Sequence, residues 1–203
     1  MTGKVRHKHW ISIALAALGL LAIFLPNADA PEEVREQIVG FASIPWGATA
    51  EHIIAEHGTP TVDEAGIHRA LAYGGERVLN EDTNTYFFVH PKKGLIKGAY
   101  FVDYGRGDDC VMVFMKFKEA ISKRYPDIKP EEYKRNQSLL DFCGGLTIGK
   151  AWWGVFWKDP ISSATISISL GLESDESILI NYESPGWNEK HAKMRETERK
   201  RRF

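Results

Sequence analysis

The first thirty residues constrain this chain most, because they decide in which compartment the rest of it folds. A cationic start over residues 1–9 precedes an apolar run over residues 10–25 and a small-residue exit at Ala28-Asp29-Ala30. These are the three parts of a secretory signal peptide. The sequence therefore predicts that the chain beyond residue 30 is exported and folds in the periplasm or outside the cell.

Two fates of this leader stay open. Ala28 and Ala30 fit a cleavage site, after which residues 1–30 would be removed as a signal peptide. However, Pro31 is a poor residue to follow such a site. The apolar run is shorter than the roughly 20 residues of a comfortable membrane span, but it is long enough for a short anchor. In that case residues 10–25 would tether the protein to the inner membrane.

An oxidising compartment gives a role to the two cysteines, Cys110 and Cys143. An even pair in an exported protein favours a disulfide. Closing a loop of about 34 residues would stabilise the fold by about 3 to 4 kcal/mol in the chain-entropy model. The close Cys-x-x-Cys spacing of redox-active thiols is absent, so we predict a structural disulfide bond.

The net charge of −1 conceals an uneven distribution along the chain. Residues 31–188 carry 23 acidic and 16 basic side chains, whereas residues 189–203 carry 3 acidic and 7 basic ones. The acidic body argues against a nucleic-acid partner. We interpret the basic C-terminal tail, residues 188–203, as a solvated terminus, with weak contact to anionic lipid head groups as the alternative.

The predicted elements come in the same order in both halves of the body. Thr49 and Gly58 bound a short helix, and the strands expected after it cover residues 67–73, 84–90 and 95–104. A second helix runs from Asp108 to about Tyr125, with a core-facing stripe at Cys110, Phe114, Phe117 and Ile121. The strands expected after it cover residues 148–157, 163–170 and 177–183.

We therefore predict an α+β fold built as a tandem repeat, in which each short helix is followed by an antiparallel β-meander. In this interpretation the strands join one sheet that carries the helices on one face. The predicted segments are the signal peptide or membrane anchor at 1–30, a linker at 31–40, a first unit at 41–106, a second unit at 107–187 and the tail at 188–203.

A short motif in the first half resembles a known family. Ile44-Pro45-Trp46-Gly47-Ala48-Thr49, with a helix ending in Glu56-His57-Gly58-Thr59-Pro60 and aromatic strands after it, resembles small envelope proteins of the SmpA/BamE type. The tandem order resembles the β-lactamase inhibitor protein fold. The resemblance implies a fold and a cell-envelope setting. The lipid-bearing cysteine of the SmpA/BamE lipoproteins is missing, and a fold alone does not fix a function.

No motif for catalysis, a metal or a cofactor stands out. His52 and His57 are five residues apart, so they do not align as metal ligands on one helix. Asp103, Asp108 and Asp109 crowd the loop before the second helix, which is more typical of helix capping than of a calcium site. Neither a Gly-x-Ser-x-Gly elbow nor a phosphate-binding loop occurs. The sequence therefore favours a protein without enzymatic activity.

The aromatic strands carry the one indication of binding. Adjacent Trp152 and Trp153 must point to opposite faces of a sheet, and Gly154 leaves room beside them for a ligand or a backbone. Burial under helices is one explanation for these aromatic side chains, and Phe156 lies in the same strand. The alternative is an exposed surface for a protein, peptide or glycan. The candidate binding residues are Trp152, Trp153, Trp157 and Phe87.

We therefore predict a non-catalytic, exported cell-envelope protein that binds a protein or peptide partner. One alternative is an envelope hydrolase whose active site is assembled from distant residues. It requires two carboxylates, or a histidine and a carboxylate, within hydrogen-bonding distance in a cleft. The other alternative is an inhibitor of a secreted enzyme.

The intact mass of the protein purified from the envelope tests the leader and the cysteines together. We expect the mass of residues 31–203 less two hydrogen atoms, because Ala30 precedes the cleavage site and the two thiols are joined. The mass of the full chain would instead show a retained anchor. A fully reduced mass would contradict the disulfide.

Overall fold

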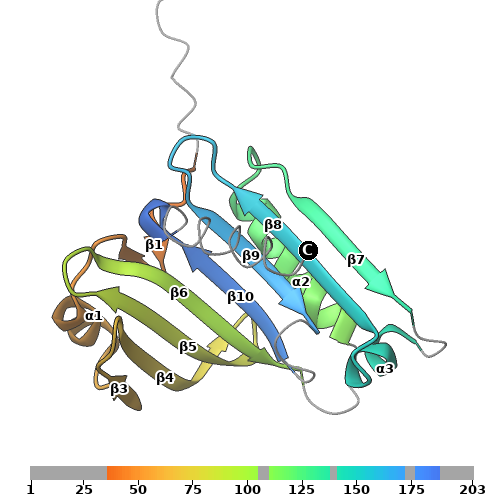
Figure 1. Ribbon diagram of the computed structural model, residues 1–203, viewed down its shortest axis with the longest axis horizontal. Coiled ribbons are helices and arrows are strands. Elements are labelled where there is room, and N and C mark those ends of the chain that lie inside the picture. The colour runs from red at the N-terminus through yellow and green to blue at the C-terminus, as the bar shows by residue number, and fades with distance from the viewer. Residues whose placement is uncertain (1–35, 105–109, 138–140, 172–176, 188–203) are drawn as a thin grey trace, which may run out of the picture. The chain divides into compact units, whose positions relative to one another are not determined.

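A computed structural model of the chain describes residues 36–104, 110–137, 141–171 and 177–187. Its main feature is one antiparallel sheet of eight strands (Figure 1). In spatial order these strands are β3 (Val62–Glu64), β4 (Arg69–Val78), β5 (Glu81–His90), β6 (Gly94–Asp103), β10 (Ser177–Glu183), β9 (Thr165–Leu170), β8 (Ala151–Lys158) and β7 (Glu131–Asn136). A second, two-stranded sheet pairs β1 (Gly40–Phe41) with β2 (Ile44–Pro45).

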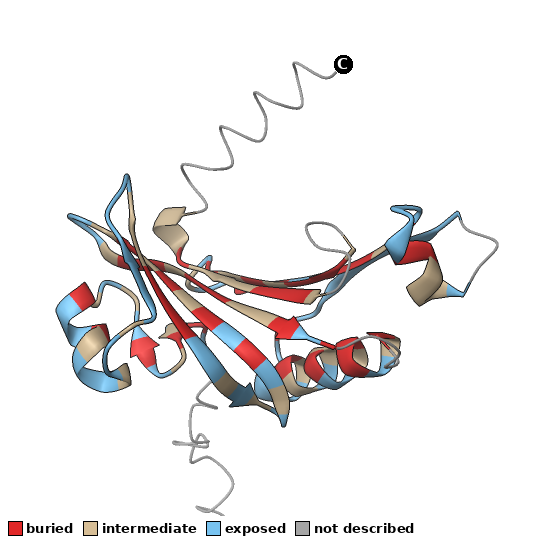
Figure 2. Cartoon of the chain, turned by 90° about the horizontal axis from the view of Figure 1, so that it is seen from below, coloured by how far each residue is buried: buried red, intermediate tan, exposed pale blue. Residues whose placement is uncertain are grey.

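Within the described residues, three helices of six or more residues accompany the sheet: α1 (Ala50–His57), α2 (Cys110–Arg124) and α3 (Phe142–Thr147). The short helix predicted between Thr49 and Gly58 is confirmed, and the Thr49 side chain accepts a hydrogen bond from the backbone N–H of His52. The second predicted helix is confirmed as α2, whose four predicted stripe residues are all buried. Both α1 and α2 lie on the same side of the large sheet (Figure 2).

The prediction of a tandem helix-plus-meander repeat is wrong. The described chain is 46% strand and 23% helix, and one large sheet dominates it. All seven residues of β10 pair with β6, from Ser177 opposite Asp103 to Glu183 opposite Lys97. Ile178, Leu179 and Ile180 are buried in succession, as in a strand with both faces covered. Strands expected at the ends of two meanders therefore close against each other in the middle of one sheet.

Local predictions differ from the structure where the chain is polar or rich in glycine. Gly74-Gly75 does not end a strand, because β4 continues to Val78 with a register shift between Tyr73 and Glu76. The polar connection after α2 contains the edge strand β7, all of whose residues are exposed, and the six-residue helix α3. Neither element has the apolar periodicity that identifies a strand or a helix in a sequence.

The strand register defines two faces of the sheet. One row of opposed residues runs Leu71, Phe87, Gly98, Tyr182, Ile166 and Trp157 from β4 to β8. These residues share the side on which α1 and α2 pack, which we call the helix face. The alternate residues form the open face, with the row Ala72, Tyr86, Ala99, Asn181, Ser167 and Phe156. None of α1, α2 and α3 packs on the described part of this face, although Ala72, Ala99 and Leu179 on it are buried.

The folded part begins before Phe41, within the segment expected to be a linker. Ile38 is completely buried, and its backbone N–H donates to Asp159 Oδ2 at 3.0 Å. The Phe41 ring occupies the space above Gly98, where an added Cβ would come within 1.9 Å of it. This N-terminal segment is therefore part of the core and needs a glycine at position 98 to pack.

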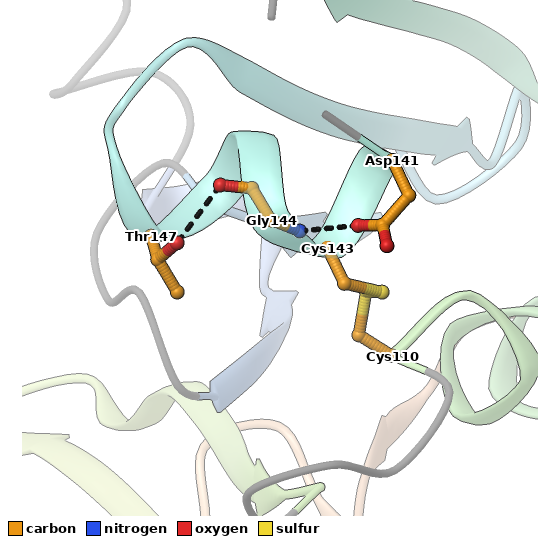
Figure 3. The surroundings of a disulfide bond; sticks show 5 residues. All are labelled: Cys110, Asp141, Cys143, Gly144 and Thr147. Carbon is orange, nitrogen blue, oxygen red and sulfur yellow. Dashed lines mark hydrogen bonds between the residues drawn. A yellow bond between two sulfur atoms is a disulfide. The ribbon is translucent and has the colours of Figure 1, made fainter. Parts of the chain in front are cut away.

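The predicted disulfide between Cys110 and Cys143 is confirmed. It joins the first residue of α2 to α3 (Figure 3). Asp141 caps α3 by accepting a hydrogen bond from the Gly144 N–H at 2.6 Å, and the Thr147 hydroxyl donates to the Gly144 carbonyl at 2.8 Å. A helix of six residues is not stable by itself, so the bond to α2 and the cap hold it in place.

Several predictions fall on segments outside the described residues. These are the leader at 1–30 with its apolar run at 10–25, the caps Asp108 and Asp109, and the tail at 188–203. None of the described helices combines the length with the apolar composition that crossing a membrane requires. The disulfide is compatible with an exported protein.

Substitution of Asp159 by Asn tests how the turn between β8 and β9 holds the N-terminal segment. Asp159 is buried and accepts hydrogen bonds from the Ile38 and Ile161 N–H groups and the Ser162 hydroxyl. Burial acts to raise its pKa, but these hydrogen bonds prevail and hold the pKa below its usual 3.8. We expect Asp159→Asn to lower the free energy of unfolding by about 1 to 3 kcal/mol near neutral pH.

The loss should shrink in acid, because stability from a depressed pKa is present above pH 3.8 and disappears as the pH falls through the folded-state value. Urea unfolding of both proteins near neutral pH and at about pH 3 measures this difference. Asp82→Asn is the control, since Asp82 is 79% exposed in its ion pair with Arg77. A constant loss at both pH values would contradict this role for Asp159.

Candidate functional site

The four aromatic residues that the sequence predicted as binding residues lie on two different faces of the sheet. Trp153, Trp157 and Phe87 lie on the helix face, with 6%, 0% and 0% of their surface exposed. Trp152 points to the open face and is partly exposed. The four residues therefore do not form one surface, and the three buried ones belong to the core.

Trp153 supports β8 from the helix face. Its ring stacks on Phe114 of α2, with ring centres 4.5 Å apart, and its indole N–H donates to Glu132 Oε1 at 2.6 Å. Lys134 Nζ lies 3.8 Å from the centre of the same ring. Cation–π and aromatic contacts of this kind hold a ring in one orientation, so β7 and β8 are fixed to each other and to α2.

The other side of β8 carries an exposed aromatic patch, formed by Tyr133, Trp152 and Phe156 around Gly154. An added Cβ at Gly154 would lie 3.2 Å from the Phe156 ring and 3.7 Å from the Trp152 ring. Gly154 is buried, so these rings fill the room that the sequence predicted beside it. Tyr133 pairs with Gly154 from β7, and its ring centre is 6.0 Å from that of Phe156. Tyr133 is 50% exposed and Phe156 is 41% exposed.

A polar hollow of about 750 Å³ adjoins the patch on the open face. Phe156 lines it, so the hollow and the patch meet at this ring. The polar groups around the hollow come from four strands and include acidic, basic and neutral side chains: Glu131, Lys158, Thr165, Ser167 and Glu183. The Thr165 hydroxyl contacts Glu183 Oε2 at 3.3 Å. The surface therefore combines exposed aromatic rings with both hydrogen-bond donors and hydrogen-bond acceptors.

Hydrogen bonds with neighbouring side chains determine the protonation of Tyr133 and Glu132 on β7. The Tyr133 hydroxyl donates to Glu131 Oε2 at 3.2 Å, and this bond raises the pKa of the phenol. A hydrogen bond from Lys118, reinforced by the bond from Trp153, lowers the pKa of Glu132. Tyr133 is thus a neutral donor near pH 7, and Glu132 is ionised.

The hydrolase alternative requires a close pair of acid–base side chains. His57 Nδ1 and Glu76 Oε1 are 3.7 Å apart, which is beyond hydrogen-bonding distance. The His57 ring packs against Tyr73 and Phe87, and Glu76 accepts a hydrogen bond from the Thr85 hydroxyl. Within the described chain, no group of three or more His, Cys, Asp or Glu residues could hold a metal ion.

Sequence reasoning placed Phe156 and Gly154 in the correct strand but missed Tyr133. Tyr133 lies in the charged stretch Glu131–Asn136, which has no apolar alternation. Its position in the patch follows from the pairing of β7 with β8, which places Tyr133 opposite Gly154, 21 residues later in the sequence. The alternating exposure of Trp152 and Trp153 was the only signal for this surface.

No protein-family model, curated protein or solved structure matches this chain.

Trp157 is buried and Trp152 is partly exposed, so replacing them by alanine should lower the free energy of unfolding by different amounts. Trp157→Ala should lower the free energy of unfolding by about 3 to 5 kcal/mol, because it leaves a cavity in the core. Trp152→Ala should cost about 1 kcal/mol or less, since its ring is partly exposed on the open face. Urea unfolding measures both. Equal losses would contradict the assignment of the two rings to opposite faces.

Proposed function

We propose that this chain is an exported, non-catalytic cell-envelope protein that binds a protein partner through the aromatic patch and strand β7. The observation that carries the proposal is the pair of half-exposed rings, Tyr133 and Phe156, which lie next to the buried Gly154 on the surface of the sheet. Tyrosine and tryptophan are enriched among the residues that dominate binding energy at protein interfaces.

The surroundings of the patch favour a protein over a small ligand. Strand β7 is an edge of the sheet and all its side chains are exposed. An edge strand offers unpaired backbone groups to which an extended segment of a partner can add. The polar rim contains Glu131, Arg135 and Lys158, so charges of both signs surround the aromatic centre, as at transient protein interfaces.

The patch is also prepared for binding before a partner arrives. The strand that carries Trp152 and Phe156 is held from behind by Trp153, which stacks on Phe114. Little conformational freedom remains to be lost when such a surface is covered, and this raises affinity. The envelope setting of the proposal comes from the leader at 1–30, the disulfide and the SmpA/BamE-like motif at 44–60.

Photo-crosslinking in living cells tests the proposal. A photoreactive residue is placed at position 133, at position 156 or at position 112, where Met112 is 64% exposed on α2. We expect one envelope protein to be crosslinked from 133 and 156 and not from 112. The purified partner should then bind Tyr133→Ala, Phe156→Ala protein at least about 30-fold more weakly than the unchanged protein.

Ile67→Ala is the control for that affinity measurement, because Ile67 is 79% exposed and lies outside the patch. It should leave the affinity unchanged. Partner affinity that survives the double substitution would contradict the proposal, as would crosslinking of equal strength from all three positions.

A further inference from the structure

Two adjoining hollows lie on the helix face, on the side of the sheet opposite the aromatic patch. The first has a volume of about 390 Å³ and is bordered by the segment from Gln37 to Pro45. The second has a volume of about 190 Å³ and lies beside α2. Tyr100, Tyr182 and Arg124 line both, so the two hollows meet at these three side chains.

The first hollow is rich in hydrogen-bond donors. Three phenols, those of Tyr100, Tyr125 and Tyr182, line it. Burial raises the pKa of each of them, to about 12 for Tyr100, so all three hydroxyls keep their protons near neutral pH. The Tyr100 and Tyr182 hydroxyls form no hydrogen bond with any other residue that the structure describes. Both residues are partly buried and line the hollow, so their hydroxyls can donate to a ligand that lies there.

Among the described residues, Arg124 is the only ionised side chain that lines either hollow. Its Nε is 3.2 Å from Glu36 Oε2, and its positive charge lowers the pKa of Tyr125 and Tyr182 against the effect of burial. The nearby carboxylates of Glu36 and Glu76 line neither hollow. The Arg124 side chain is 69% exposed and is shared with Glu36, so it supplies at most one positive charge to the hollow. A ligand with a single negative charge fits this site, because a dianion would face no second cation among the lining residues.

The second hollow is apolar apart from the three shared residues. The side chains that line it are Val78, Leu79, Phe117, Ala120, Ile121 and Ile180. An apolar cavity of about 150 Å³ in another protein holds benzene. The hollow beside α2 therefore has room for one aromatic ring or a short alkyl chain.

We propose that these hollows form a binding site for a small amphipathic monoanion, namely a carboxylate that carries one aromatic ring or a short alkyl chain. The carboxylate lies in the first hollow, where it accepts hydrogen bonds from Arg124 and from the Tyr100 and Tyr182 hydroxyls. The apolar end fills the second hollow between α2 and the sheet. This site is independent of the protein-binding surface proposed above.

Calorimetric titration of the full folded protein with octanoate and with 3-phenylpropanoate tests the site. We expect at least one of them to bind with a stoichiometry of one, and the amine of equal length, octylamine or 3-phenylpropylamine, to bind at least tenfold more weakly. Arg124→Gln and Tyr182→Phe should each weaken carboxylate binding several-fold, because each removes a donor and keeps most of the side-chain volume.

A filling substitution separates a site from non-specific adsorption. Ala120→Phe places a ring in the second hollow and should abolish binding, whereas Ala55→Phe, on the exposed side of α1, should have no effect. Arg135→Gln, on β7, should also leave carboxylate binding unchanged. The inference is overturned if neither carboxylate binds, if the amines bind equally well, or if Ala120→Phe binds as the unchanged protein does.

Thermal unfolding of each variant shows that it is folded before titration. Substitution of the patch residues Tyr133 and Phe156 should leave carboxylate binding intact. Loss of octanoate binding and loss of partner binding can therefore be observed separately, so the failure of one proposal does not decide the other.

Discussion

The pairing of β10 with β6 is the contact on which the rest of the structure depends. It joins the strands that precede α2 to those that follow it, and every residue of β10 takes part. Through β10 the register passes to β9 and β8, so that Val102, Ile178, Leu170 and Trp153 lie in one row. Since a slip of one residue would turn every side chain of a strand to the other face, this register decides which aromatic rings are buried.

The two faces then acquire different roles. The helix face carries two apolar clusters, one under α1 and one under α2. The open face carries the alternate residues of each strand, which include serine and threonine on β9, asparagine on β10 and aromatic residues on β8. The same strand supplies a core ring at Trp153 and a surface ring at Phe156, so the strand that carries the patch is packed against the core from behind. The candidate carboxylate site lies on the other side, between α2, the sheet and the N-terminal segment.

Local chemistry made part of the fold predictable. Thr49 and Gly58 mark the ends of α1, the stripe from Cys110 to Ile121 marks the buried side of α2, and the even cysteine count indicated the disulfide. These signals depend on neighbours in sequence or on a simple chemical rule. Strand partners do not, because β6 and β10 both look like apolar strands and nothing local shows that they pair. The tandem repeat was inferred from order alone, and the central pairing overturned it.

For the site, the sequence predicted only that successive side chains of β8 point to opposite faces of the sheet. Adjacent tryptophans had to face opposite sides, but the register with β9 determines that Trp153 is the one in the core. Tyr133 and the polar hollow depend on β7, whose exposed charged residues look like a loop in the sequence. The phenols of Tyr100, Tyr125 and Tyr182 come together from two strands and the end of α2, so no sequence motif contains them.

Hydroxyl-radical footprinting of the oxidised, folded protein, with oxidation located by mass spectrometry, tests the central claim most directly. The account predicts that Tyr133 and Phe156 are oxidised readily, whereas Trp153 and Trp157 are protected until the protein unfolds, although free tryptophan reacts faster than free phenylalanine. Protection of Tyr133 and Phe156 together with rapid oxidation of Trp153 and Trp157 would contradict the register of the sheet and, with it, both proposed surfaces.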